Sequence, residues 1–73
     1  ALDRKHRAMV ESLLRAGQRN GSVTTELAPE PMAVLFMALL RGITTQWLID
    51  PEAIDLDAVY LELQRLLTRG LGA

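Results

Sequence analysis

The sequence contains no cysteine, and its only aromatic residues are Phe36, Trp47 and Tyr60. Without cysteine the chain forms neither disulfides nor a thiolate zinc site, and this composition suits a reducing cytosol. With so few aromatic residues, any core must consist of aliphatic side chains. A chain of 73 residues obtains only about 3–5 kcal/mol from its own core, so we expect it to depend on a partner or on further residues of a longer protein.

A strong charge of one sign is also absent, because the net charge is −1. A marked overall attraction to nucleic acid or to an anionic membrane is therefore not expected. The charge is nevertheless divided unevenly: residues 1–22 contain five basic and two acidic side chains, and residues 23–73 contain three basic and seven acidic ones. We interpret the basic first segment as a solvated helix face. Phosphate contact is the alternative, but acidic residues interrupt the basic run and no aromatic residue accompanies it.

The sequence has few residues that could perform chemistry. Its only histidine is His6, its serines are Ser12 and Ser22, and no Gly-x-Ser-x-Gly motif is present. A nucleophile needs a base within hydrogen-bond reach, and Ser12 falls on a different helix face from His6. Asp3 and His6 are one helical turn apart, but two ligands without a third do not complete a zinc site. We therefore predict no enzymatic activity, no metal site and no cofactor.

Hydrophobic periodicity predicts three helices and no strands, over residues 2–19, 29–49 and about 55–70. Asn20-Gly21 tolerates positive φ and should end the first helix, Pro29 suits the first turn of the second, and Asp50-Pro51 should end it. Asp55 or Asp57 should cap the third helix, and Gly70 should form its left-handed end.

In the first segment one stripe is predicted to be the apolar face, and Val10 and Gly17 lie at its edge. Favourable i,i+4 ion pairs are expected between Asp3 and Arg7 and between Glu11 and Arg15. The stripe consists of Leu2, His6, Met9, Leu13 and Ala16.

The second segment is apolar without interruption from Met32 to Leu40. A membrane span over residues 32–49 is disfavoured because Arg41 lies near its middle. A helix-turn-helix is disfavoured as well, since the preceding loop is too long and the following helix too apolar. The helix should have two contact faces, one of large residues (Met32, Phe36, Leu39, Leu40, Ile43 and Trp47) and one of smaller residues (Leu35, Ala38, Gly42 and Ile49).

Two neighbouring helices cannot cover both faces along their length. The simplest completion is a second copy of the chain, which would pack its second and third helices on these to form a four-helix bundle. The alternative is that a preceding part of the same protein covers the exposed face. We expect such a part, because the chain begins at Ala1 without methionine and already within a helical pattern.

Five short segments carry a recognisable pattern, namely residues 17–23 (GQRNGSV), 27–30 (LAPE), 39–43 (LLRGI), 46–51 (QWLIDP) and 66–71 (LLTRGL). In their order and spacing these segments resemble the C-terminal half of TetR-family (tetracycline-repressor-like) bacterial transcriptional regulators. The resemblance covers essentially the whole chain, and it departs from the family at Ala28, where an aspartate often caps the helix.

The resemblance implies that residues 1–73 are one fragment of an all-α C-terminal domain that dimerises and binds a small-molecule effector. The last two helices would form a dimeric four-helix bundle, and operator DNA would be bound only by a missing N-terminal helix-turn-helix domain. The implied dimer interface contains Leu35, Ala38, Gly42, Ile49, Leu56, Val59, Leu63 and Leu66. The implied effector pocket contains His6, Met9, Leu13, Met32, Phe36 and Trp47, whose apolar and adaptable side chains suit a ligand cavity.

By this resemblance the chain is expected in the bacterial cytoplasm, as part of a repressor that a small apolar ligand releases from DNA, with no role for a membrane. Other interpretations remain open at this point. The pocket residues are alternatively plain core, the chain is alternatively a purely structural dimerisation module, or it is a scaffold fragment of an unrelated helical protein.

Overall fold

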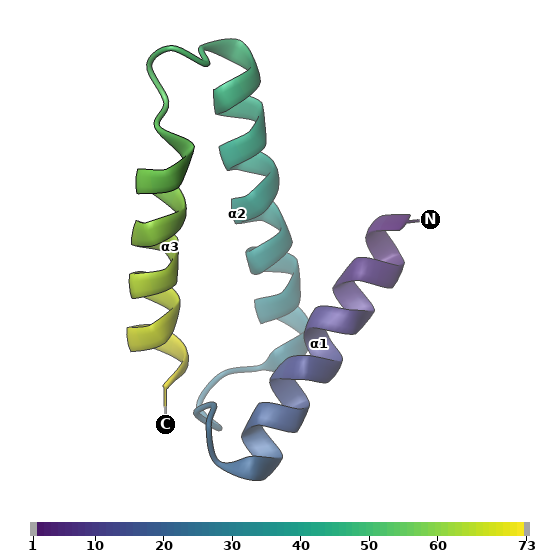
Figure 1. Cartoon of the computed structure of the whole chain (residues 1–73). Coiled ribbons are helices and arrows are strands. Elements are labelled where there is room, and N and C mark those ends of the chain that lie inside the picture. The colour runs from purple at the N-terminus through teal and green to yellow at the C-terminus, as the bar shows by residue number, and fades with distance from the viewer. Residues whose placement is uncertain (1, 73) are drawn as a thin grey trace.

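A computed structural model describes residues 2–72 of the chain, with only the backbone described at Leu2. Three helices make up most of this part: α1 (Leu2–Asn20), α2 (Pro29–Ile49) and α3 (Leu56–Leu71) (Figure 1). The predicted all-α class is confirmed, and the predicted helix bounds agree within one or two residues.

The ends of the helices follow from local chemistry. Gly21 adopts φ +86° directly after α1, a conformation that glycine adopts without steric cost. The Asp55 carboxylate accepts a hydrogen bond from the Ala58 N–H at 3.2 Å and caps α3 as predicted. At α2 the N-cap residue is Ala28, which makes no side-chain hydrogen bond.

The prediction that Gly70 ends the third helix is wrong. α3 continues to Leu71, and Gly72, its C-cap, has φ −59°. The Thr24 N–H donates to the Leu71 carbonyl at 2.8 Å, beside an isolated antiparallel bridge between Val23 and Gly72. The loop after α1 thus satisfies a terminal carbonyl of α3, so a left-handed residue is not needed there.

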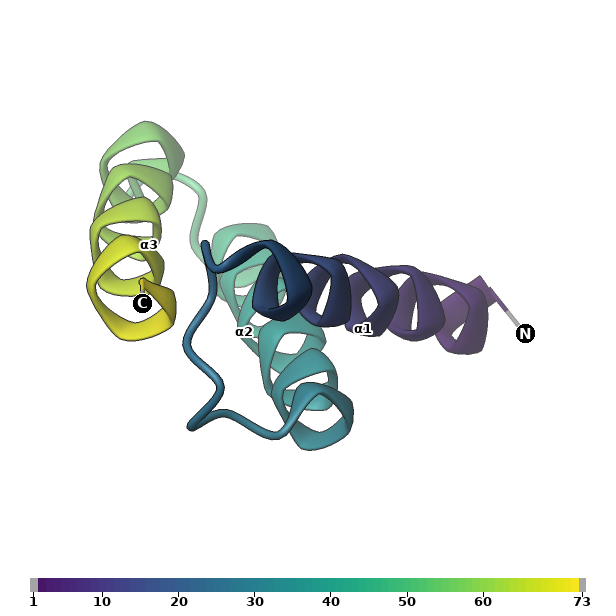
Figure 2. The same cartoon turned by 90° about the horizontal axis from the view of Figure 1, so that it is seen from below.

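α2 is the central helix of the molecule. α3 runs antiparallel beside it, and α1 crosses its N-terminal half at an angle (Figures 1 and 2). Within residues 2–72, α1 and α3 each pack on α2 and not on each other. The three helices therefore form a flat assembly whose Cα atoms extend over 41 × 30 × 14 Å.

The described side chains form a small core. Leu14 of α1 and Ala33 of α2 are the buried hydrophobic residues, and Gly17 is also buried. The larger apolar residues of α2 that we predicted to form one face are half-buried, apart from Trp47, which is more exposed. On α3 the half-buried stripe comprises Leu56, Val59, Leu63 and Leu67.

The packed face of α1 differs from the predicted stripe. Leu14, Gly17 and Val10 turn inward, whereas Met9 and Leu13 are 56% and 66% exposed. The apolar arc of α1 is wider than one neighbouring helix, and α2 covers only the edge of it. The side chain of Leu2, which we predicted to belong to the same stripe, lies outside the described part.

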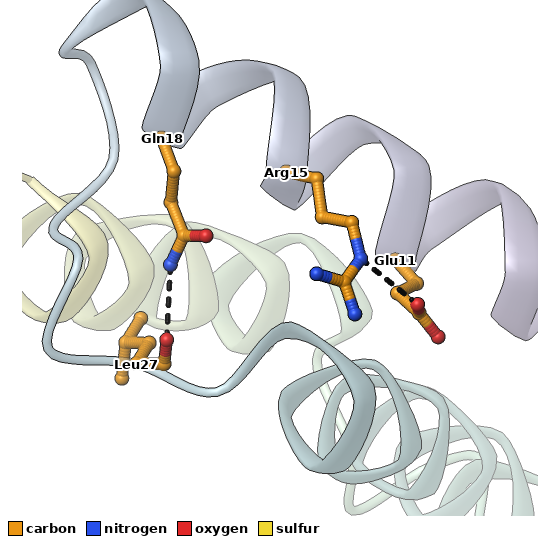
Figure 3. Close-up of polar contacts among 4 residues, drawn as sticks. All are labelled: Glu11, Arg15, Gln18 and Leu27. Atoms are coloured by element: carbon orange, nitrogen blue, oxygen red, sulfur yellow. Dashed lines mark hydrogen bonds and ion pairs between the residues drawn. The ribbon is translucent and has the colours of Figure 1, made fainter.

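Four hydrogen bonds at Gly17 and Gln18 connect the loop of residues 21–28 to the end of α1. The Gly17 carbonyl accepts hydrogen bonds from the Ser22 and Val23 N–H groups at 2.9 and 3.0 Å. The Gln18 side-chain amide donates to the carbonyls of Thr24 at 3.0 Å and of Leu27 at 2.9 Å (Figure 3 shows the bond to Leu27). This one amide satisfies two backbone groups of a loop that has few partners of its own.

We predict that Gly17→Ala destabilises the fold although alanine is the better helix former. A Cβ at residue 17 would clash with Cγ2 of Val23, and such overpacking lowers the free energy of unfolding by about 1–3 kcal/mol. Gly70→Ala is the matched control, because nothing lies within 4 Å of its added Cβ. Thermal unfolding followed by circular dichroism at one protein concentration should place G17A below and G70A at or above the parent chain. Equal midpoints for G17A and the parent would contradict this packing.

Adjacent leucines of α1 test which of its faces is packed. Leu14 is 9% exposed, and truncating a buried leucine to alanine costs about 2–5 kcal/mol. The same truncation at the exposed Leu13 should lower the free energy of unfolding by less than about 0.5 kcal/mol. Denaturant unfolding of Leu14→Ala and Leu13→Ala should give this order, whereas the reverse order would restore the stripe predicted from the sequence.

Candidate functional site

One face of α2 carries apolar and small residues that the rest of the described chain leaves largely uncovered, although Gly42 is half-buried. We call Leu35, Ala38, Gly42 and Ile49 the open face of α2. Leu35 is 52% and Ile49 79% exposed, and Ala38 is exposed as well. A Cβ on Gly42 would meet no atom within 4 Å, so the helix backbone is accessible there. These four residues are the small-residue face predicted from the sequence.

The predicted interface residues of α3 divide into two groups. Leu66 is 62% exposed, whereas Leu56, Val59 and Leu63 are half-buried. Because α3 packs on α2, part of the surface of these three residues is already buried within the chain. Of the predicted interface residues, Leu35, Ile49 and Leu66 therefore offer the most exposed apolar surface to a partner.

The surface of the whole chain is large for its mass. A compact protein of this mass exposes roughly 4,500 Å², and this chain exposes 5534 Å². A compact chain of this length has a radius of gyration of about 11 Å, and this one has 13.6 Å. The excess of roughly 1,000 Å² is comparable with the area that one partner buries in a standard protein interface.

The six predicted pocket residues do not line any of the five main cavities among the described residues. His6, Met9 and Leu13 lie on the exposed side of α1. Met32 and Phe36 are half-buried in α2, and Trp47, near its C-terminal end, is 37% exposed. The five cavities found between described residues are lined by other side chains.

Two adjoining cavities lie between α1 and α2 instead. The larger one, which we call the Arg41 cavity, has a volume of about 370 Å³. The smaller one, the Glu30 cavity, measures about 210 Å³ and shares Arg7 and Val34 with the first. The Arg41 cavity is lined by Asp3, Arg7, Val34, Met37, Ala38 and Arg41, and the Glu30 cavity also by Arg4, Ala8, Glu11, Glu30 and Ala33.

An ion pair between Asp3 and Arg41 spans the Arg41 cavity and joins the first turn of α1 to the middle of α2. The predicted pairing of Asp3 with Arg7 is therefore wrong, because a non-local partner takes its carboxylate. The predicted pair of Glu11 and Arg15 is confirmed at 3.0 Å (Figure 3). Helical spacing reveals i,i+4 neighbours only, so sequence reasoning missed the contact with Arg41.

Within residues 2–72, no group of three histidine, aspartate or glutamate side chains is placed to hold a metal ion. α2 is the one described helix that is long and apolar enough to cross a membrane, with a mean hydropathy of 1.5 over its most apolar window. Core helices of soluble proteins have the same composition, and Arg41, paired with Asp3, lies within this one. Length and composition alone therefore do not make α2 a membrane span.

The sequence itself decides the family. Residues 1–72 match the family described as "BetI-type transcriptional repressor, C-terminal". The chain belongs to this family of TetR-type C-terminal domains. No curated protein and no solved structure matched the chain.

Membership of the BetI-type family agrees with the all-α structure, and it confirms the resemblance to TetR-type regulators. It indicates a segment of a transcriptional repressor and implies a regulatory, non-enzymatic role.

Proposed function

We propose that this BetI-type domain is the homodimerisation platform of a TetR-type repressor and forms one wall of its effector pocket. The dimer would join α2 and α3 of each copy in a four-helix bundle. Operator DNA would be bound by a helix-turn-helix that precedes this segment, and the whole protein would work in the bacterial cytoplasm.

The observation that carries the dimer proposal is the uncovered apolar area of α2 and α3. Leu35, Ile49 and Leu66 expose more than half of their surface, and apolar surface gains roughly 25 cal/mol per Å² when it leaves water. A symmetric interface buries the same patch on both copies, so one self-complementary face is sufficient. Ala38 and Gly42 support the proposal because their small side chains let two helices approach closely.

The proposed pocket wall rests on the exposed apolar side of α1. Met9 and Leu13 are too exposed for core residues of a complete domain, and Met32, Phe36 and Trp47 offer further apolar surface on α2. A preceding part of the repressor would close this wall into a cavity. A ligand that binds one conformer more tightly shifts the population toward it, and a coupling of about 1–3 kcal/mol changes operator affinity usefully.

A purely structural dimerisation module is the second candidate, and the exposed face of α2 supports it equally well. The two candidates differ in how they account for Met9 and Leu13. A pocket explains why these apolar side chains are exposed, whereas a purely structural module leaves their exposure unexplained. A scaffold role in an unrelated helical protein is no longer supported, since the family match covers residues 1–72.

We predict that Gly42→Leu weakens dimerisation and leaves the fold of each copy intact. No described atom outside the helix's own backbone and the adjacent residues lies within 4 Å of an added Cβ at this residue, so we expect a leucine there to project into the space that a partner helix would occupy. The dissociation constant of the dimer should rise at least about tenfold, which corresponds to roughly 1.4 kcal/mol.

Sedimentation equilibrium over a concentration series measures this constant. Ala58→Leu is the matched control, because Ala58 is exposed on α3 outside the predicted interface, and it should leave the constant unchanged. If G42L and A58L dimerise like the parent chain, Gly42 does not lie at the interface and the proposed bundle is incorrect.

A further inference from the structure

The Arg41 cavity combines cationic groups with an apolar lining. Its charged residues are Arg7 and Arg41, against the single carboxylate of Asp3, and the rest of its lining is Val34, Met37 and Ala38. A volume of about 370 Å³ lies within the range of roughly 300–1,000 Å³ typical of small-molecule sites.

The charges around the cavity favour an anion at this position. Asp3 already places one carboxylate against the Arg41 guanidinium, which shows that a carboxylate fits this part of the groove. Arg7 takes part in none of the ion pairs found among residues 2–72, so its guanidinium is available to a second anionic group. A guanidinium binds a carboxylate through two parallel N–H···O hydrogen bonds, a geometry that an ammonium does not reproduce.

The neighbouring Glu30 cavity does not share this preference. Its lining includes Arg4 and Arg7 but also Glu11 and Glu30, and Glu11 forms an ion pair with Arg15. Positive and negative groups balance there, so the excess of positive charge is confined to the side of the groove that contains Arg41.

We propose that the Arg41 cavity binds a small organic anion, namely a monocarboxylate with an aliphatic chain. Its carboxylate would bind the guanidinium groups of Arg7 and Arg41 in competition with Asp3, and its chain would lie on Val34 and Met37. Binding would then release the first turn of α1 from α2. None of the residues of the pocket wall proposed above lines this cavity, so the anion site is a separate proposal and is tested independently of that function.

Octanoate, octylammonium and 1-octanol share one aliphatic chain and differ in their head group, so they are suitable probes. Titration of the ¹⁵N-labelled chain, followed by amide chemical shifts, should show saturable binding of octanoate with changes at residues 3–7 and 34–41. Octylammonium and 1-octanol should bind at least tenfold more weakly. Equal binding of all three would mean that the cavity recognises only the aliphatic chain, and no saturable binding of octanoate would mean that no such site exists. Either result overturns the proposal.

Substitutions separate recognition by the arginines from a general effect of charge. Arg7→Gln and Arg41→Gln should each weaken octanoate binding at least fivefold. Arg19→Gln removes the same charge from an exposed residue at the far end of α1, and it should change the affinity less than twofold. If R7Q and R41Q bind octanoate as R19Q does, the proposal fails.

Asp3→Asn should change the octanoate affinity in the opposite direction to the arginine variants. This test does not depend on whether those variants are stable. Removing the competing carboxylate should tighten octanoate binding two- to fivefold. Glu52→Gln, a substitution in the exposed loop after α2, controls for net charge and should have a smaller effect. Weaker binding by D3N would overturn the proposed competition.

Octanoate binding by a chain that stays monomeric would support the anion site and contradict the dimer, whereas a dimer without octanoate binding would do the reverse.

Discussion

The structure depends on one constraint: α2 carries apolar side chains around most of its circumference, but only two helices flank it. α1 covers the side near Ala33, and α3 covers another side with its stripe of leucines and Val59. The open face of α2 remains in water. Apolar surface of this kind gains free energy when it leaves water, which is the physical reason for the partner proposed above.

The flat shape and the large surface are consequences of that constraint. With α1 and α3 on different sides of α2, the chain cannot enclose a core with more than a few buried side chains, and Leu14 and Ala33 are its buried hydrophobic residues. The hydrogen bonds of the loop after α1 compensate in part, because they join the end of α1, the loop and the end of α3. Membership of the BetI-type family assigns this three-helix layer to the C-terminal domain of a repressor.

Much of the fold could be predicted from local sequence signals. Gly21, Pro29 and Asp55 mark helix ends through their own backbone or side-chain chemistry, and the structure places all three where these signals suggest. Features that depend on tertiary contacts could not be predicted in this way. Met9 and Leu14 both lie on the wide apolar arc of α1, and only the position of α2 decides which is buried. The pairing of Asp3 with Arg41 and the cavity that it spans join residues far apart in the sequence, so no spacing rule reveals them.

The central claim is that a second copy covers the open face of α2, and isotope-filtered NOE spectroscopy tests it most directly. In an equal mixture of labelled and unlabelled chain, we expect cross-peaks between copies from the methyl groups of Leu35, Ile49 and Leu66. Their absence, or intermolecular cross-peaks confined to Met9 and Leu13 of α1, would contradict the account.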